Sequence, residues 1–150
     1  MTNLTYISSD LSSLLADVQM DITDVPFEQT SFDVVLCTHV FEHVVDDYQA
    51  MRECFRVLKP GGWAILQSPV EMNRERTFEK PALATPEDRA RTFGHPDHVR
   101  VYGRDYVDRL ESVGFAVQVD DYASEFAADS LRRFGLDKHQ VIYVCTRPSS

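Results

Sequence analysis

The chain has 150 residues, a length typical of one domain and sufficient for a single hydrophobic core. Apolar residues make up 43% and charged residues 26% of it, with six Gly and seven Pro, which excludes collagenous, disordered and low-complexity proteins. No apolar run approaches the roughly 20 residues of a membrane span, and the N-terminus has neither a basic region nor an apolar signal core. We therefore expect a cytoplasmic protein that does not contact a membrane.

The net charge of −9 is distributed unevenly along the sequence. The first Lys or Arg is Arg52, and nine acidic residues precede it. Because such a surface repels phosphates, we expect no direct binding of nucleic acid by the first third of the chain. The cysteines Cys37, Cys54 and Cys145 are widely spaced and form no Cys-x-x-Cys pair, so we interpret them as buried, reduced thiols.

The first half of the sequence predicts four strands and one helix. Residues 4–10 and 17–22 are short β-favouring runs, and each brings an aspartate to its end. Residues 32–37 are an almost continuous apolar run, typical of a strand buried on both faces near the centre of a parallel sheet. Apolar residues at spacings of three and four predict a helix over 46–58, which the following Pro-Gly-Gly ends. Residues 63–69 return as a strand, which completes a parallel strand–helix–strand crossover.

The second half begins with an irregular segment. Residues 71–104 carry six of the twelve arginines, three prolines and no sustained periodicity, which predicts a lid or insertion with short helices around 86–91. A helix over 105–113 and strands over 115–119 and 141–145 follow. We find no internal repeat or second domain. The alternation predicts an open α/β sheet whose ligand site lies beyond the carboxyl ends of its strands.

Two segments carry a family resemblance. Residues 32–43 read FDVVLCTHVFEH, and residues 56–62 read RVLKPGG. In this order they resemble the class I S-adenosylmethionine-dependent methyltransferases, most closely their small-molecule, type 11-like branch, strongly over residues 4–70 and by element order beyond. The resemblance implies a Rossmann-like, three-layer α/β sandwich with a mostly parallel sheet, formed by a single methyltransferase-like domain over residues 1–150 with 71–104 as lid. It also implies methyl transfer from S-adenosylmethionine to a small molecule.

The resemblance further implies which residues contact the cofactor. Asp10 would hold the two ribose hydroxyls, which suits the acceptor capacity of a carboxylate. Asp21, with the Ile22 backbone, would face the adenine amino group, and residues 37–39 would border the methionine moiety and the methyl group. Because in-line transfer from a sulfonium needs chiefly alignment, no protein nucleophile is required, and His39 is the candidate catalytic residue. The predicted cofactor-binding residues are Asp10, Asp21, Ile22, Cys37, Thr38 and His39.

One family feature is not found in the sequence. Family members begin with a strand and a glycine-rich turn, where the backbone approaches the cofactor closely. Here the first glycine is Gly61, so we expect a fold truncated at the N-terminus, without the first strand, that turn and the following helix. The strands around Tyr6 and Val35 would then lack a strand between them and pair with each other or with another chain. We therefore expect a homodimer.

Two other functions remain open. A shortened, non-catalytic member of the family would serve as a binding or assembly module. Separately, His39, Glu42 and His43 match the His-x-x-Glu-His pattern of one group of zinc peptidases. That pattern needs all three side chains on one helix, whereas His39 directly follows a strand. We therefore expect Glu42 and His43 to pair with neighbouring backbone, and no metal to bind there.

The predicted lid contains a second group of candidate residues. A histidine in it would act as general base toward a substrate received by this group. Six acidic residues lie in the same stretch, so charge pairing that needs no substrate is the alternative. The group consists of His95, His98, Arg100, Tyr102 and Arg104.

Overall fold

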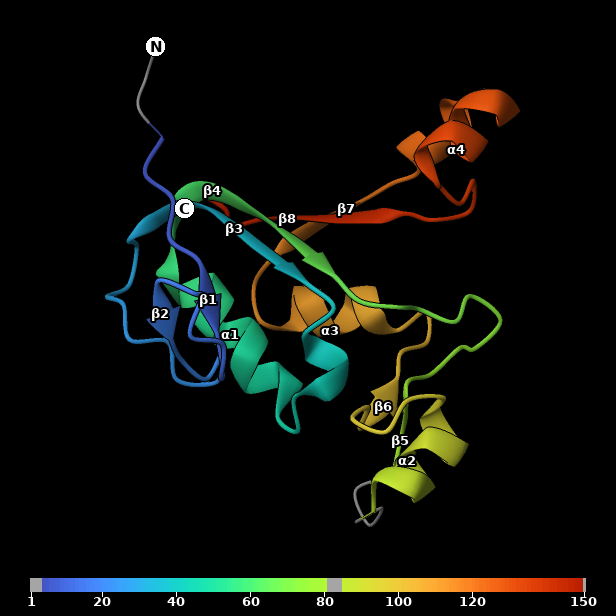
Figure 1. Cartoon of the computed structure of the whole chain (residues 1–150). Helices are drawn as coiled ribbons and strands as arrows, with labels where there is room; N and C mark the ends of the chain where they lie inside the picture. The colour runs from blue at the N-terminus through green and yellow to red at the C-terminus, as the bar shows by residue number, and fades with distance from the viewer. Residues whose placement is uncertain (1–3, 81–84, 150) are drawn as a thin grey trace.

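The computed structural model describes residues 4–80 and 85–149, and its main body is a four-stranded sheet (Figure 1). The strands are β3 (Phe32–Thr38), β4 (Leu58–Gln67), β7 (Ala116–Asp120) and β8 (Ile142–Thr146), in the order β3-β4-β8-β7. The pair β3–β4 is parallel, whereas β4–β8 and β7–β8 are antiparallel. The α/β class is confirmed, and this sheet is mixed.

The predicted strand–helix–strand crossover is confirmed. Helix α1 (Asp47–Val57) connects β3 to β4, and the Asp46 side chain caps it by accepting a hydrogen bond from the Gln49 backbone N–H at 2.9 Å. Strand β4 begins at Leu58, earlier than predicted, and includes the Pro-Gly-Gly segment. The pairing register shifts there, between Phe32 and Val34 of β3, so the extra residues fit as an irregularity of the strand.

The two N-terminal strands are much shorter than predicted. Strands β1 (Ser9–Asp10) and β2 (Val18–Gln19) form a parallel pair of their own, and neither joins the main sheet. Before β1, the Ser8 carbonyl accepts from the Val18 N–H of β2 at 3.1 Å, and residues 4–7 are not part of a strand. The expected pairing of the strands around Tyr6 and Val35 with each other is therefore wrong within this chain.

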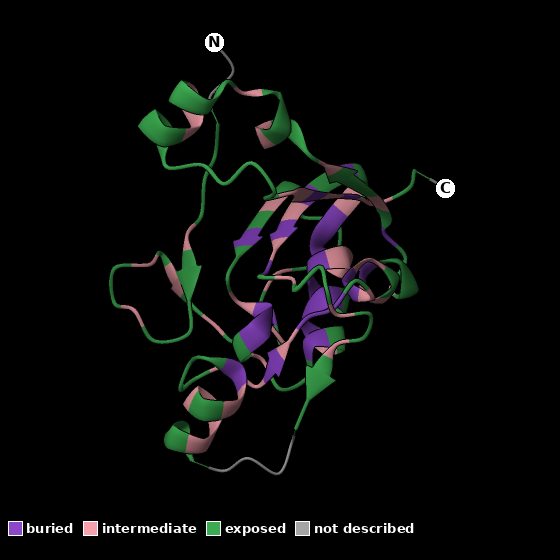
Figure 2. Ribbon diagram, turned by 90° about the vertical axis from the view of Figure 1, so that its right-hand side faces the viewer, coloured by how far each residue is buried: buried purple, intermediate pink, exposed green. Residues whose placement is uncertain are grey.

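Strand β3 lies at the edge of the sheet, so the prediction of a central position is wrong. It pairs with β4 alone in the described part of the chain, and Val34 and Leu36 are 38% and 64% exposed. Helices α1 and α3 (Tyr106–Ser112) both cover the opposite face (Figures 1 and 2). The open face also exposes Trp63 beside Val34, so the predicted second helical layer is not found in residues 4–80 and 85–149.

The hydrophobic core lies between the sheet and the two helices. Its centre is a row of tyrosine rings, with centroid distances of 4.6 Å between Tyr102 and Tyr106 and 4.9 Å between Tyr106 and Tyr143. The Tyr106 hydroxyl donates to the Leu66 carbonyl at 3.1 Å, which satisfies a fully buried polar group. The prediction of buried, reduced thiols is confirmed, since Cys37, Cys54 and Cys145 are free and buried.

The segment 71–104 contains short elements, as predicted. Strands β5 (Phe78–Glu79) and β6 (Arg100–Val101) form an antiparallel pair, and α2 (Pro86–Phe93) lies between them in sequence. Two short helices are η1 (Phe41–His43) and η2 (Tyr122–Glu125). Helix α4 (Ala128–Phe134), which the sequence analysis does not predict, lies between β7 and β8 in the sequence and projects away from the sheet (Figure 1). None of the helices described is long and apolar enough to cross a lipid bilayer.

Candidate functional site

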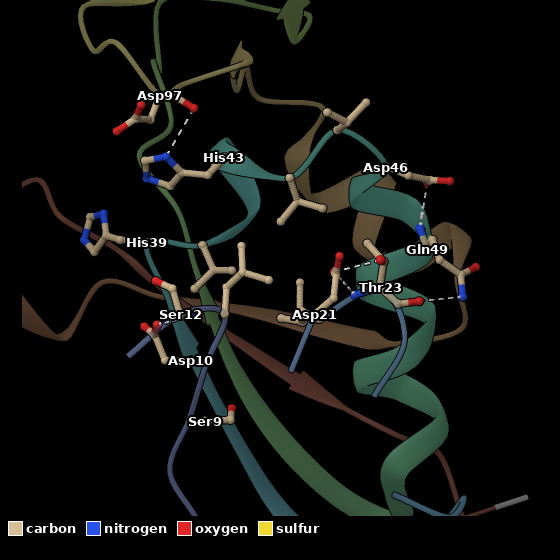
Figure 3. A pocket seen from close by; sticks show the side chains of 15 residues that line it. Ser9, Asp10, Ser12, Asp21, Thr23, His39, His43, Asp46, Gln49 and Asp97 are labelled. Carbon is tan, nitrogen blue, oxygen red and sulfur yellow. Dashed lines mark hydrogen bonds between the residues drawn. The ribbon is translucent and has the colours of Figure 1, made fainter. Parts of the chain in front are cut away.

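A cavity of about 960 Å³ lies beside the β1–β2 pair, at the carboxyl end of β3 and the start of α1 (Figure 3). Its wall comes from residues 9–12, 21–23, 39–40 and 43–46, with Gln49 and Asp97. Of the predicted site residues, the structure brings Asp10, Asp21, Ile22 and His39 to this cavity. These four come from three strand ends that are far apart in the sequence.

Asp10 ends β1 and is held by a tight turn. Its Oδ1 accepts hydrogen bonds from the backbone N–H groups of Ser12 at 2.8 Å and Ser13 at 2.7 Å. These two bonds hold the pKa of Asp10 below its usual value, so the carboxylate is ionised at neutral pH. Both bonds fall on one oxygen, and the second oxygen keeps acceptor capacity for a ligand.

Asp21 is fixed in a similar way. Its Oδ1 accepts from the Thr23 backbone N–H at 2.8 Å and from the Thr23 hydroxyl at 2.7 Å, and these bonds lower its pKa. The Gln49 side-chain amide donates to the Thr23 carbonyl at 3.3 Å, which links this turn to α1 (Figure 3). The cavity therefore has two ionised carboxylates, each positioned by its own turn.

His39 stands at the point where β3 ends. Its backbone has a φ of 56°, a left-handed conformation that few residues other than glycine adopt, and its N–H donates to the Gln67 carbonyl at 2.8 Å. The imidazole ring of His39 is exposed, and its Nδ1 lies 3.3 Å from Oε1 of Glu42. Glu42 is itself buried, and its Oε2 accepts from the Ser68 hydroxyl at 2.9 Å. His39 also borders a second cavity of about 340 Å³ that contains Gln67 and Ser68.

Cys37 and Thr38 do not line either cavity. The Cys37 side chain is buried in the core, where a hydrogen bond with Cys54 and burial raise the pKa of its thiol well above the usual range. Thr38 is exposed at the end of β3. Strand alternation explains the difference, because consecutive residues of β3 face opposite sides of the sheet.

The lid candidates are divided between the core and the surface. Arg100 is buried and donates to the carbonyls of Phe41 and Val45, both at 2.8 Å. The Tyr102 hydroxyl is fully buried and donates to Asp47 at 2.8 Å, and burial raises its pKa far above the usual value. These two residues therefore hold the lid and cannot receive a substrate. Arg104 is exposed.

The histidines of the His-x-x-Glu-His pattern do not converge with the glutamate on one helix. His39 precedes η1, and Glu42 points into the interior toward Ser68. His43 instead faces the lid: its Nδ1 lies 3.3 Å from the Asp97 carbonyl, and its ring packs against His95 and His98. Burial and the neighbouring His43 lower the pKa of His98.

Several cavity residues escape the sequence reasoning. Val44 and Val45 carry no motif, and Asp97 reaches the cavity from the lid, 51 residues after Asp46. Asp46 and Gln49 have one local signal, since an aspartate three residues before a glutamine is typical of a helix start. The position of Asp97 depends on how the lid folds back, for which the sequence offers no signal.

Comparisons with known proteins show which proteins this sequence resembles. Residues 5–66 match a family model described as a methyltransferase domain. A Mycolicibacterium smegmatis protein named "Probable S-adenosylmethionine-dependent methyltransferase" is 32% identical over 99 residues, which cover 65% of this chain and 34% of that protein. A ubiquinone biosynthesis O-methyltransferase of Xanthomonas oryzae is 42% identical over 64 residues, covering 39% of this chain and 27% of that protein. The chain thus spans about a third or less of these relatives.

The fold is similar to that of solved methyltransferases. A crystal structure of an S-adenosylmethionine-dependent methyltransferase from Mesorhizobium loti superposes with a TM-score of 0.63 at 17% identity, covering 93% of this chain and 78% of that one. The matched segment, residues 5–66, includes the strand ends that supply Asp10, Asp21 and His39. Residues 5–66 are thus similar in sequence to methyltransferase domains, and the described chain has a fold similar to that of a solved methyltransferase.

Proposed function

We propose that this chain binds S-adenosylmethionine in the 960 Å³ cavity and serves methyl transfer to a small molecule. The observation that carries the proposal is the convergence of Asp10, Asp21 and His39 on one cavity, within the segment that matches the family. Ligands of open α/β sheets bind beyond the carboxyl ends of the strands, which is where this cavity lies.

The polar groups of the cavity fit the cofactor's polar groups. Asp10, ionised and fixed by its turn, would accept from both ribose hydroxyls. Asp21 and the Ile22 backbone would face the adenine amino group. The acidic lining, which also includes Asp46 and Asp97, complements the positive charge of a sulfonium. When bound, the cofactor supplies an activated methyl group.

The chain's own contribution is to orient the acceptor and to take up its proton. We place the acceptor in the 340 Å³ cavity, because His39 borders both cavities. The ring of His39, with Nδ1 3.3 Å from the Glu42 carboxylate, would accept a proton from an acceptor hydroxyl or amine at Nε2. The buried carboxylate stabilises the imidazolium that forms, as in other base–orienter pairs.

Calorimetric titration with S-adenosylmethionine tests the binding step. We expect Asp10→Asn to weaken binding at least about tenfold, because it removes a charged acceptor of two hydroxyl groups. The matched control is Asp17→Asn: Asp17 accepts from the Ser8 backbone N–H at 2.8 Å, close to β1, but does not line the cavity. No heat at millimolar cofactor, or equal loss in both variants, would contradict the proposal.

The open face of the sheet favours a second function, assembly, with or without methyl transfer. We propose that two copies associate through this face, which exposes Val34, Leu36 and Trp63 beside the unpaired edge of β3. Light scattering tests this: we expect a dimer mass that Leu36→Asp reduces to the monomer. Leu14→Asp, at an exposed leucine outside the sheet, is the control. A monomer at high concentration in the unsubstituted chain would defeat the assembly proposal.

We also propose that residues 1–150 form one domain with 71–104 as its lid, and that the protein works in the cytoplasm. Support for one domain is the Arg100 side chain, which joins β6 of this segment to η1 and to the loop after η1. Three free, buried cysteines suit a reducing compartment. Limited proteolysis that cuts within 71–104 and leaves the sheet intact would support the lid, and fractionation of expressing cells tests the location.

A further inference from the structure

Three histidines from two distant segments meet at the rim of the large cavity. His43 comes from η1, and His95 and His98 come from the loop after α2. The ring centroids of His98 lie 4.7 Å from those of both His43 and His95, and the latter two are 5.7 Å apart. One ring nitrogen of each residue lies within 4.8 Å of the other two.

The peptide of Asp97 orients two of these rings. Its carbonyl lies 3.3 Å from Nδ1 of His43, which fits a ring that donates at Nδ1 and presents the lone pair of Nε2. Such a hydrogen bond from a ring to a backbone carbonyl is the usual partner of a metal-bound histidine. The Asp97 N–H donates to Nδ1 of His95 over 3.3 Å, a bond weak enough for a metal ion to replace.

We propose that His43, His95 and His98 bind one divalent transition-metal ion, with Zn²⁺ as the first expectation. Imidazole is a preferred ligand of zinc, copper and nickel, whereas magnesium and calcium need oxygen ligands that this trio does not offer. Three histidines with a fourth position left to water or substrate are a known arrangement for zinc. The site does not depend on the cofactor proposal.

The geometry requires a small closure of the side chains. Zinc–nitrogen distances of about 2.0–2.1 Å in a tetrahedron place ligand nitrogens about 3.3 Å apart, against separations of up to 4.8 Å in the metal-free arrangement. Rotation of exposed side chains provides this movement, since His43 and His95 are exposed and His98 is half-buried. The backbone of both segments stays in place.

A bound metal would fix the rim of the cavity. His43 and Asp97 both line the cavity, and they come from η1 and from the lid respectively. One ion held by both segments therefore joins the lid to η1 at the rim of the 960 Å³ cavity. The bound metal would hold the loop over residues 94–99 against η1.

Titration of the metal-free full chain with Zn²⁺ alone, followed by calorimetry, tests the site. We expect one ion per chain, and single variants His43→Gln and His98→Gln that bind at least about tenfold more weakly, since even an outer-shell partner is worth that much. His139→Gln is the matched control, because His139 lies outside the cluster. Mg²⁺ should give no heat.

Two further measurements separate this site from other causes. Co²⁺ in place of zinc should give visible bands without the near-ultraviolet band of thiolate ligands, which excludes the cysteines. In the absence of metal, His43→Gln and His98→Gln should have the same melting temperature as the unsubstituted chain. Zn²⁺ should raise the melting temperature of the unsubstituted chain but not that of these two variants. The proposal would be overturned if the chain did not bind Zn²⁺ at millimolar concentration, or if the Co²⁺ spectrum showed a thiolate band. It would also be overturned if His43→Gln and His98→Gln bound Zn²⁺ as tightly as His139→Gln.

Discussion

Arg100 is one of the side chains that anchor the lid, and Arg100→Met tests its contribution. Arg100 is 3% exposed, and its guanidinium donates to the carbonyls of Phe41 and Val45 at 2.8 Å and also to that of Val44. It approaches Glu79 at 3.1 Å and Asp47 at 3.6 Å. Methionine keeps the apolar stem and removes every donor.

The expected loss of unfolding free energy is about 3 to 4 kcal/mol. Three carbonyl groups lose the hydrogen bond from Arg100, at about 1 kcal/mol each. The Phe41 carbonyl keeps the Val44 N–H at 3.2 Å and the Tyr102 hydroxyl at 3.3 Å. Breaking a buried ion pair costs about 3–5 kcal/mol, but Asp47 keeps Arg109 and Tyr102, both at 2.8 Å, and Glu79 is partly hydrated. The loss of the ion pairs therefore adds little to the loss of the three hydrogen bonds, and the expected total stays at about 3 to 4 kcal/mol.

Urea unfolding followed by circular dichroism measures this loss. The control is Arg52→Met, because Arg52 is exposed on α1 and its side chain bonds the Gln49 side chain at 3.1 Å. We expect the control to change stability by less than about 0.5 kcal/mol. A loss below about 1 kcal/mol for Arg100→Met would refute the reasoning, since it would mean that water or another side chain satisfies the three carbonyls.

Three further predictions concern single positions. Hydrogen bonds from Arg56 hold the pKa of Glu53 below its ordinary value in the folded chain. The stability that Glu53 contributes is therefore present above its unfolded pKa and is lost as the pH falls through its folded pKa. Glu53→Gln should flatten the acid side of a curve of unfolding free energy against pH. Asp46→Ala removes the cap on the Gln49 N–H and should cost about 1 kcal/mol in urea unfolding, whereas Asp46→Asn should cost less. Gly103→Ala would place its Cβ 2.6 Å from a backbone carbon of the facing loop and should lower the melting temperature by several degrees; an unchanged melting temperature would mean that the loop moves freely.

Local patterns predicted the elements of the fold more accurately than their partners. The spacing of apolar residues places α1 within a residue of its bounds, because this signal lies inside the helix. The run beginning at Phe32 predicts β3 but not its position in the sheet. A strand's position depends on the segments that pair with it, and a continuous apolar run is the same in a central strand and in an edge strand with one open face.

The residues that line the large cavity could likewise be predicted only where the signal is local. Asp10 and Asp21 were identifiable because strand ends and turn residues are local signals. Asp97 and the meeting of His43 with His95 were not, because they depend on the path of the lid, which Arg100 fixes through backbone carbonyls. Every residue has a backbone carbonyl, so no sequence motif shows which three carbonyls accept hydrogen bonds from Arg100.

One carboxylate joins three parts of the molecule. Asp47, in the first turn of α1, accepts from Arg109 of α3 and from Tyr102 beside β6, and Arg100 of β6 lies 3.6 Å away. Opening any one of these elements alone would break at least one contact of this buried carboxylate. In hydrogen-exchange terms, the start of α1, β6 and α3 should therefore open as one cooperative unit with a shared free energy, whereas α4, which has no buried residue, should exchange independently and faster.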